Sequence, residues 1–559
     1  MGNCLYGVDA ERAKEGANGN KSSANTSNSS KRNSQQKRAV HSNLMTEHHV
    51  DVYKKYSETE VLGNGSMGHV AKVILKGADA PSTTKAKSAA YRNREHTGSS
   101  IRESTVVSYA LKSIQLDRVS TIFVEELRNE IEILKTMDHP NIVKLHEVFS
   151  YKQQMYLILE LCDGGDLYTR LPYTEKASAY ITGKLLSAIK YMHDRAIVHR
   201  DLKFENIMFE NNSPEAEIKV IDFGLSKKFV SNKMGYMREG VGTLYSMAPQ
   251  VLQGIYTSQA DMWSVGVISY MLLSSHRPFY NKKRKVMIDR IMRCDYNFDK
   301  DYWKPISSEA KDFIDHLLVI DPKIRFNAKM AQRHKWMHRE FNAEDRAPTA
   351  STTERVAENL LRYKNNSALK KLALNVIAHR TSTTDIINLR KTFDQMDTAN
   401  DGVITFKEFE RALKDKCKYS TDDIVEMFDS IDVNQNGHIM YTEFIAATLE
   451  AQGQLDEDQI LQAFDRLDID NTGTISKENM MDFFRDTGVT DKEIEQMLRE
   501  ADDDKNGQVS FNEFLAMFRS KNFNAADMIE TYETESADEA DLLGIDAVIP
   551  GGRYDSGRT

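Results

Sequence analysis

The spacing of apolar residues predicts strands and one helix in the first third of the chain. Apolar residues on either side of a glycine-rich turn, Val61–Leu62 and Val70–Leu75, predict two strands, and alternation over Val106–Ile114 predicts a third. Phe123–Met137 has apolar residues at helical spacing, and Met155–Leu161 has the composition of a buried strand. This part of the chain therefore mixes β and α structure.

The spacing becomes helical further along. Glu175–Met337 is mainly helical, with one irregular interruption, and a polar linker over Arg346–Thr353 precedes a basic amphipathic helix over Arg355–His379. Residues 385–519 then repeat one helix–loop–helix unit four times, at spacings of 35, 36 and 34 residues. We expect an α+β fold class, in which a mixed domain is followed by an all-α domain.

Composition defines the ends of the chain. Residues 1–50 carry 7 Lys/Arg against 4 Asp/Glu, and residues 520–559 carry 3 against 9, so we expect a basic disordered arm and an acidic disordered tail. Residues 77–104 are polar and basic, and we expect an inserted surface loop. The 559 residues, with a net charge of -9, are enough for more than one core.

Two classes of protein are disfavoured by the sequence. No apolar run approaches the ~20 residues of a membrane span, and the start lacks the apolar core of a secretory signal. The four cysteines are scattered, without disulfide or zinc spacing, which is typical of a reducing cytosol. We expect a cytoplasmic protein with no nucleic-acid partner.

Four short motifs in the mixed domain follow one another in a meaningful order. A Gly-x-Gly-x-x-Gly segment lies in Gly63–Val70, Lys112 ends an Ala-Leu-Lys strand, His199–Asn206 contains His-Arg-Asp, and Asp222–Gly224 is Asp-Phe-Gly. A glycine-rich segment alone is weak evidence, because it also occurs in dinucleotide-binding folds. The ordered set is specific for phosphoryl transfer.

Each residue type suits a step of that chemistry. Glycines let the backbone approach the phosphates of ATP, and Lys112 would neutralise the α- and β-phosphates. Glu130, on the predicted helix, would hold Lys112. Asp201 would accept or orient the proton of the substrate hydroxyl, and Lys203 would contact the γ-phosphate.

Residues 56–336 resemble a protein kinase of the calmodulin-kinase group, with the two-lobed kinase fold. Lys203 and Thr243 match serine/threonine kinases, and the resemblance implies that Asn206 and Asp222 hold magnesium. The residues it implies for ATP binding are Leu62, Gly63, Gly65, Gly68, Val70, Lys112, Glu160, Asp166, Asn206 and Asp222. Asp166 also matches an acidic position near a basic substrate residue.

One residue departs from the kinase pattern. Ala-Pro-Glu is replaced by Ala-Pro-Gln, with Gln250 at the position of a glutamate that would pair with Arg325. Glutamine accepts a hydrogen bond but forms no ion pair. We expect a less stable C-terminal lobe with intact chemistry.

The four repeats carry calcium-binding loops, with oxygen ligands at positions 1, 3, 5, 7, 9 and 12 and a glycine at position 6. The fourth loop is the strongest match and the second is good. The predicted ligands are Asp397, Asp401, Thr405 and Glu408 in the first loop, Asp432, Asn434, Asn436, His438 and Glu443 in the second, and Asp502, Asp504, Asn506, Gln508, Ser510 and Glu513 in the fourth. His438 and Gln508 would contribute backbone carbonyls.

Two loops have lost ligands. Ala399 occupies position 3 of the first loop, which predicts lower affinity, and Asn479 replaces the bidentate glutamate of the third. We expect the third hand to complete a pair of hands without binding calcium tightly.

The whole chain resembles the calcium-dependent protein kinases of plants and apicomplexan-type protists, over residues 50–520. This resemblance implies a calcium-activated serine/threonine kinase that needs ATP, Mg2+ and Ca2+, with kinase domain 56–336, autoinhibitory junction 340–380 and calcium domain 385–519. The junction would be bound by the calcium-loaded hands. Two alternatives are a calcium-sensing scaffold with an inactive kinase fold and a kinase that binds external calmodulin.

The first residues suggest a membrane anchor. Met1-Gly2-Asn3-Cys4 resembles a myristoylation start with a cysteine for palmitoylation, although Tyr6 stands where Ser or Thr is usual. One acyl chain binds membranes only marginally, so Cys4 or the basic arm would supply the second signal. The alternative is an ordinary soluble start.

Overall fold

The computed structural model describes residues 44–65, 68–76, 107–228, 237, 242–339, 350–381, 386–414, 419–452, 455–485, 487 and 489–519. Most of the expected disordered arm, the whole of the expected insert loop at 77–104 and the acidic tail lie outside these ranges. So do residues 340–349 at the start of the junction.

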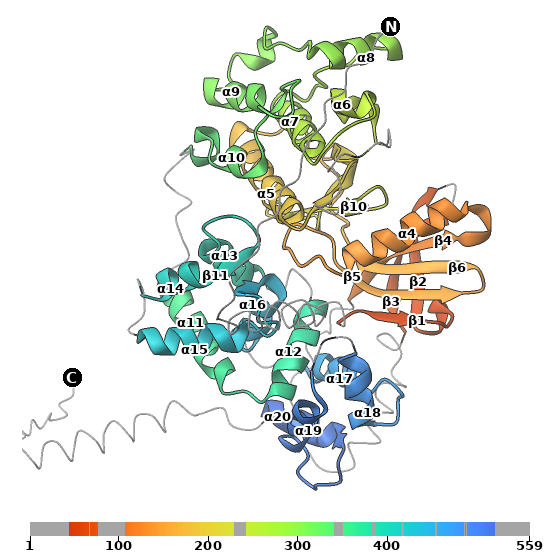
Figure 1. Ribbon diagram of the computed structural model, residues 1–559, viewed down its shortest axis with the longest axis vertical. Coiled ribbons are helices and arrows are strands. Elements are labelled where there is room, and N and C mark those ends of the chain that lie inside the picture. Colours follow the sequence, from red (N-terminus) through yellow and green to blue (C-terminus); the bar gives the residue numbers. More distant parts are fainter. Residues whose placement is uncertain are drawn as a thin grey trace, which may run out of the picture.

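A six-stranded sheet with one helix forms the N-terminal lobe (Figure 1). Its strand order is β1-β5-β6-β4-β3-β2. The bounds are β1 Thr46–His48, β2 Tyr56–Gly65, β3 Gly68–Leu75, β4 Ser108–Gln115, β5 Leu145–Tyr151, β6 Gln154–Glu160 and α4 Thr121–Leu134. The predicted strands and helix are confirmed, and the sequence did not predict β1 or β5.

The C-terminal lobe is mainly helical, as predicted. Its helices are α5 Glu175–Asp194, α6 Pro249–Leu252, α7 Gln259–Ser274, α8 Arg284–Arg293, α9 Ser308–Leu317 and α10 Ala328–Gln332. The irregular interruption contains the short strands β7 Ile197–Val198, β8 Ile207–Phe209, β9 Ile218–Val220 and β10 Lys227–Lys228. Helix α7 is buried along nearly its whole length, which makes it the central support of this lobe.

The junction forms two helices instead of the single predicted one. They are α11 Ala350–Lys364 and α12 Ala368–Arg380. The break follows from local chemistry, because the Ser367 side chain accepts a hydrogen bond from Lys370 N and so caps a new helix. Apolar residues of both helices belong to the same core as the four hands.

The four hands pair as predicted. Their helices are α13 Ile387–Met396, α14 Phe406–Lys414, α15 Thr421–Ile431, α16 Tyr441–Thr448, α17 Glu457–Leu467, α18 Lys477–Phe483, α19 Asp491–Arg499 and α20 Phe511–Arg519. The loop strands β11 Val403–Thr405 and β12 His438–Met440 join hands one and two, and β13 Thr474–Ile475 and β14 Val509–Ser510 join hands three and four.

The ordered chain begins earlier than residue 50, so the predicted end of the arm is wrong. Strand β1 pairs in parallel with β5, and Leu44 and Met45 are buried. Leu44 belongs to the core of the hands, and Arg466 of α17 donates hydrogen bonds to the carbonyls of Leu44 and Met45. Short polar β1 has no sequence signal because its partner strand lies about 100 residues later.

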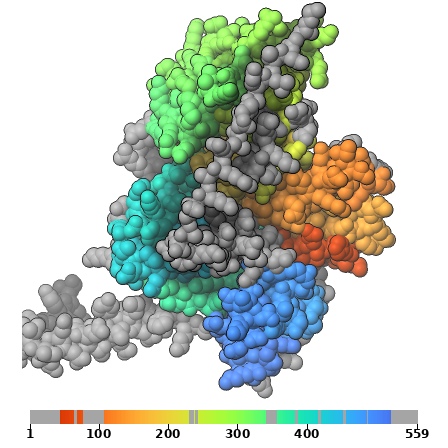
Figure 2. Space-filling model, viewed as in Figure 1, coloured from red at the N-terminus to blue at the C-terminus, as the bar shows by residue number. Residues whose placement is uncertain are grey.

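The calcium domain lies against both lobes. Figure 2 shows the first two hands, in cyan, beside the green C-terminal lobe, and the last two, in blue, beside red β1. Within the described part of the chain, no helix has the length and apolar character needed to cross a membrane.

Candidate active site and calcium loops

Three charged residues converge at the predicted nucleotide site. Lys112 Nζ lies 2.8 Å from Glu130 Oε1 and 3.6 Å from Asp222 Oδ1. Burial would lower the pKa of Lys112, but Glu130 and Asp222 outweigh it and raise the pKa, so the lysine is held charged. For Asp222, burial raises the pKa, and Lys112 with other groups lowers it overall. The predicted Lys112–Glu130 pair is formed.

The glycine-rich strands lie over this cluster. Register pairing puts Val70 of β3 opposite Lys112 of β4, while Leu62 is exposed beside Gly63. A Cβ atom on Gly68 would lie 1.8 Å from the carbonyl oxygen of Ser113, so only glycine fits there. Gly65 ends β2, and the turn to β3 lies outside the described residues.

Two other predicted nucleotide residues lie at the hinge between the lobes. The Glu160 carboxylate is bound to Lys219 Nζ at 2.8 Å and accepts a hydrogen bond from Lys144 N. Its side chain is therefore engaged within the protein, and its backbone N–H donates to the carbonyl of Lys144. Asp166 is half-buried and accepts a hydrogen bond from Tyr168 N.

The catalytic loop forms a closed hydrogen-bond cluster around Asp201. Its Oδ2 lies 2.7 Å from Lys203 Nζ, and its Oδ1 accepts a hydrogen bond of 2.7 Å from Thr243 Oγ1. Lys203 also donates to Thr243, at 3.1 Å. Asn206 Nδ2 donates to the Asp201 carbonyl at 2.9 Å. Asp201 and Lys203, two of the predicted catalytic residues, and the threonine typical of serine/threonine kinases are therefore assembled at one point.

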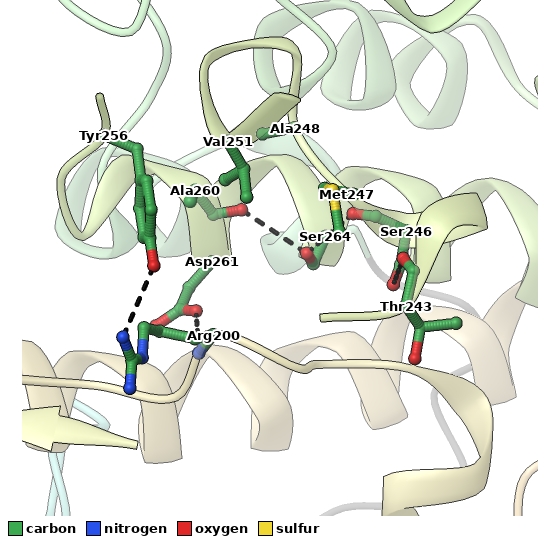
Figure 3. Close-up of a pocket in the computed structure, with 10 residues that line it drawn as sticks. All are labelled: Arg200, Thr243, Ser246, Met247, Ala248, Val251, Tyr256, Ala260, Asp261 and Ser264. Atoms are coloured by element: carbon green, nitrogen blue, oxygen red, sulfur yellow. Dashed lines mark hydrogen bonds between the residues drawn. The ribbon is translucent and has the colours of Figure 1, made fainter. Parts of the chain in front are cut away.

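The segment before Asp201 is fixed from helix α7. Asp261 accepts hydrogen bonds from the backbone N–H groups of His199 and Arg200, and Arg200 reaches the hydroxyl of Tyr256 at 3.5 Å (Figure 3). Arg200 has a positive φ of 72°, which these contacts hold in place. Figure 3 shows a small pocket lined by Arg200, Tyr256 and Asp261, and Thr243 lies at its edge on the neighbouring segment.

The departure at Gln250 has the expected geometry. Gln250 Oε1 accepts a hydrogen bond of 3.2 Å from Arg325 Nη2, and Arg325 donates its other bonds to backbone carbonyls. Arg325 is buried, and burial lowers its pKa to about 10. A neutral partner thus stands beside a buried cation.

The four calcium loops share one backbone form. In each loop the residue at position 4 and the glycine at position 6 have positive φ. The aspartate at position 1 accepts two backbone N–H bonds, from residues 5 and 6 of its loop. The geometry thus turns carboxylates inward in all four hands.

The loops differ in how many carboxylates converge. In the fourth, ligand oxygens of Asp502, Asp504 and Glu513 lie within 4.8 Å of one another, as a divalent cation requires. In the second, the buried Glu443 accepts bonds from the backbone N–H groups of Asn434 and Met440. Burial raises the pKa of Glu443 well above its usual range, and the nearby Asp432 adds to this effect. A bound cation would relieve that cost, so both loops fit calcium.

The other predicted loop ligands are also placed at their loops. Glu408 of the first loop accepts bonds from Ala399 N and Thr405, while burial and then Asp401 raise the pKa of Asp397 to about 7. The remaining ligands take part in loop hydrogen bonds or loop strands, namely Asn436, His438, Asn506, Gln508 and Ser510. In the third loop Asn479 bonds Ser476, as a helix cap.

Sequence reasoning missed the contacts between domains. Thr442 at the start of α16 donates to both carboxylate oxygens of the buried Asp138, at 3.0 and 2.7 Å. Arg390 of α13 forms two bonds with Glu210. Isolated polar and charged residues are usually solvated, so no sequence signal distinguishes these pairs.

The end of the junction is anchored to the N-terminal lobe. Arg380 Nη2 lies 2.5 Å from Glu147 Oε1 of β5, and Lys55 Nζ lies 2.6 Å from the same oxygen. Glu147 is 0% exposed, and although burial raises its pKa, Arg380 and Lys55 bring it down to about 2. His379 contacts the carbonyl of Leu145.

Comparison with known proteins agrees with this geometry. The protein kinase domain model matches residues 96–337, and the EF-hand domain pair model matches residues 387–449 and 457–519. Calcium-dependent protein kinase 5 of Plasmodium falciparum is 32% identical over 465 residues, 82% of this chain and 76% of that protein. Calcium-dependent protein kinase 9 of Arabidopsis thaliana is 34% identical over 427 residues, 75% of this chain and 78% of that protein. With a kinase domain followed by two pairs of EF-hands, the chain belongs to the calcium-dependent protein kinases.

Proposed function

We propose that this calcium-activated serine/threonine kinase performs phosphotransfer with Asp201 as the residue that orients and accepts the proton of the substrate hydroxyl. The observation that carries this is the closed cluster of Asp201, Lys203 and Thr243, with both Asp201 oxygens engaged. A substrate hydroxyl would replace the Thr243 hydroxyl as the donor to Asp201, so that Asp201 would bind the substrate hydroxyl and Lys203 together. Lys203 would also contact the γ-phosphate.

The nucleotide would lie between the glycine-rich strands and Lys112. Magnesium, held by Asn206 and Asp222, would neutralise charge on the phosphates. Glu130 keeps Lys112 charged and oriented, so Lys112 would position the phosphates and offset their charge. Asp166 at the hinge supports binding of the ribose and a preference for basic residues near the phosphorylated Ser or Thr.

We assign the junction, residues 340–380, as the inhibitory element that calcium controls. Its helix α12 packs against α16, α17 and α19, with Leu369, Leu374 and Ala378 fully buried there. This is the arrangement expected of a junction captured by the hands. At low calcium the basic junction would instead occlude the substrate cleft, which makes the exchange of partners a two-state switch.

Truncation after Phe341 tests the inhibitory role. The fragment ends beyond the last turn of the C-terminal lobe, Lys335–His338, and should be active without calcium. Phosphorylation of a generic basic serine peptide is the measurement, with the full chain in chelator as the reference. A silent but folded fragment would show that the calcium domain activates by supporting the kinase fold.

The start of the chain supports membrane attachment through Gly2 myristoylation and Cys4 palmitoylation. Gly2→Ala should move the protein to the soluble fraction, since myristate attaches only to an N-terminal glycine. Cys4→Ser measures the second signal separately. Unchanged partitioning of both variants in fractionated cells would leave acylation without a role.

The alternative, a calcium-sensing scaffold with an inactive kinase fold, predicts that catalytic groups are lost or displaced. Against it, all three of Lys112, Asp201 and Asp222 are present, with Lys112 3.6 Å from Asp222 and Asp201 2.7 Å from Lys203, which supports an active kinase. An assay of phosphotransfer by the wild type and by Asp201→Asn distinguishes the two. A kinase should lose phosphotransfer in the variant, whereas a scaffold would show none in either form.

A further inference from the structure

The first calcium loop is itself a contact surface with the kinase domain. Lys190 Nζ of α5 lies 3.0 Å from Asp401 Oδ2, and Gln332 Nε2 donates to the carbonyl of Asn400. Gly402 packs so closely that a Cβ atom there would lie 2.0 Å from the ring of His139. A calcium loop and the C-terminal lobe therefore share one interface.

The two carboxylate oxygens of Asp401 have different surroundings. Oδ2 accepts the Lys190 bond, whereas Oδ1 is buried and has no hydrogen-bond partner. Asp401 stands at position 5 of the loop, where one oxygen binds the cation. An unpartnered buried oxygen is costly unless something binds it, and with Oδ2 taken by Lys190, Oδ1 is the oxygen of Asp401 that is left for a cation.

We propose that Lys190 of the kinase domain is a positioning residue for the first calcium loop. It holds the outer oxygen of Asp401 so that the inner oxygen is presented to calcium. Docking of the first hand on the C-terminal lobe and calcium binding by that hand then strengthen each other, because coupling between two binding events is reciprocal. The inference rests on calcium binding by the first loop, whose ligands the sequence predicts.

The first loop differs from the others in needing such a partner. Position 5 is the charged Asp401 here, and the neutral Asn436, Thr472 and Asn506 in the other three loops. Ala399 leaves the first loop without a side-chain ligand at position 3, so the orientation of position 5 matters more. The kinase domain thus orients one ligand of a loop that has lost another.

Two effects of Lys190 oppose each other. Its charge repels a calcium ion nearby, and its hydrogen bond orients a ligand. Lys190 also pairs with Asp194 at 2.8 Å, which offsets part of its charge. Removing an outer partner of a metal ligand typically lowers metal affinity 10–100-fold. We therefore expect orientation to dominate, and loss of Lys190 to weaken calcium binding at the first hand about tenfold.

The experiment isolates the first hand in the full chain. A parent carrying Glu443→Gln and Glu513→Gln disables the second and fourth loops, while the third already lacks its glutamate. Calcium affinity is measured by titration against a chromophoric chelator. Lys190→Met is compared with Lys190→Arg, which keeps the charge and the donors and should stay within about threefold of the parent.

Lys184→Met is the matched control. Lys184 lies on the same helix and binds Asp394 at 2.5 Å, a docking ion pair that includes no calcium ligand. It should change affinity less than Lys190→Met. Unchanged or tighter binding in Lys190→Met, or equal losses in both variants, would overturn the role of Lys190. Absence of calcium binding in the parent would instead overturn the first loop as a calcium site, and the inference with it.

Discussion

Replacement of Arg380 by methionine should release the end of the junction from the N-terminal lobe. Methionine keeps most of the apolar stem and removes the guanidinium. Glu147, 0% exposed, would keep Lys55 at 2.6 Å and the Tyr56 hydroxyl at 3.1 Å. Breaking a buried ion pair costs about 3–5 kcal/mol, and the remaining partners place this change near the lower end, about 3 kcal/mol.

Hydrogen exchange measures this loss where it occurs. About 3 kcal/mol corresponds to roughly a hundredfold faster opening-limited exchange of amides in α12 and β5, at 1.4 kcal/mol per factor of ten. Global unfolding is less suitable, because a multidomain chain does not unfold in one step. Amides of α7, inside the C-terminal lobe, should keep their protection.

Arg499→Met provides the control, because Arg499 is 76% exposed and pairs with Glu495 within one helix. It should change exchange by less than about threefold, as exposed pairs contribute little. Unaltered exchange of α12 and β5 in Arg380→Met, or an equal effect of Arg499→Met, would refute the assignment of Glu147 as the buried anchor.

Three further predictions concern the calcium ligands, the stability of the C-terminal lobe and the pH dependence of the Glu147 anchor. Glu443→Gln and Glu513→Gln should each shift activation to about tenfold higher calcium, measured by kinase assay, while Asn479→Ala should do little; equal effects would contradict the ligand count. Gln250→Glu should raise the melting temperature of the C-terminal lobe by about 2–4 °C per kcal/mol gained from the new ion pair with Arg325. A melting temperature in calorimetry below that of the wild type would refute the idea that Gln250 makes the lobe less stable. The Glu147 pKa is depressed from 4.5 to about 2, so its stabilisation is full above pH 4.5 and is lost as pH falls through about 2. The ratio of exchange rates of α12 and β5 amides between Glu147→Gln and wild type, compared at the same pH, should therefore stay constant from pH 7 to 5 and shrink only below; shrinkage near neutrality would contradict the depressed pKa.

The site could be predicted from sequence because its chemistry fixes both residue type and order. Lys112 pairs with Glu130, and Asp201 with Lys203, as the motifs predict, since phosphoryl transfer requires those groups at those spacings. Calcium loops are equally local, because their ligands come from one twelve-residue segment. Even the pairing of Gln250 with Arg325, as a neutral acceptor, was predicted.

The contacts between domains could not be predicted in the same way. Asp138 and Thr442 are 304 residues apart, and Arg390 and Glu210 are 180 apart. Each is an ordinary polar residue until the tertiary structure buries it. The break between α11 and α12 was missed because the apolar period continues across Ser367, whose side chain restarts the helix.

Phosphotransfer by the purified full chain, with and without calcium, tests the central claim most directly. A generic serine peptide with nearby basic residues serves as substrate, with ATP and magnesium present. We predict that phosphate incorporation appears with micromolar calcium, is absent in chelator, and is lost at all calcium concentrations in Asp201→Asn while calcium binding persists. Equal incorporation in calcium and chelator, or full activity of Asp201→Asn, would contradict a calcium-switched kinase that acts through this aspartate.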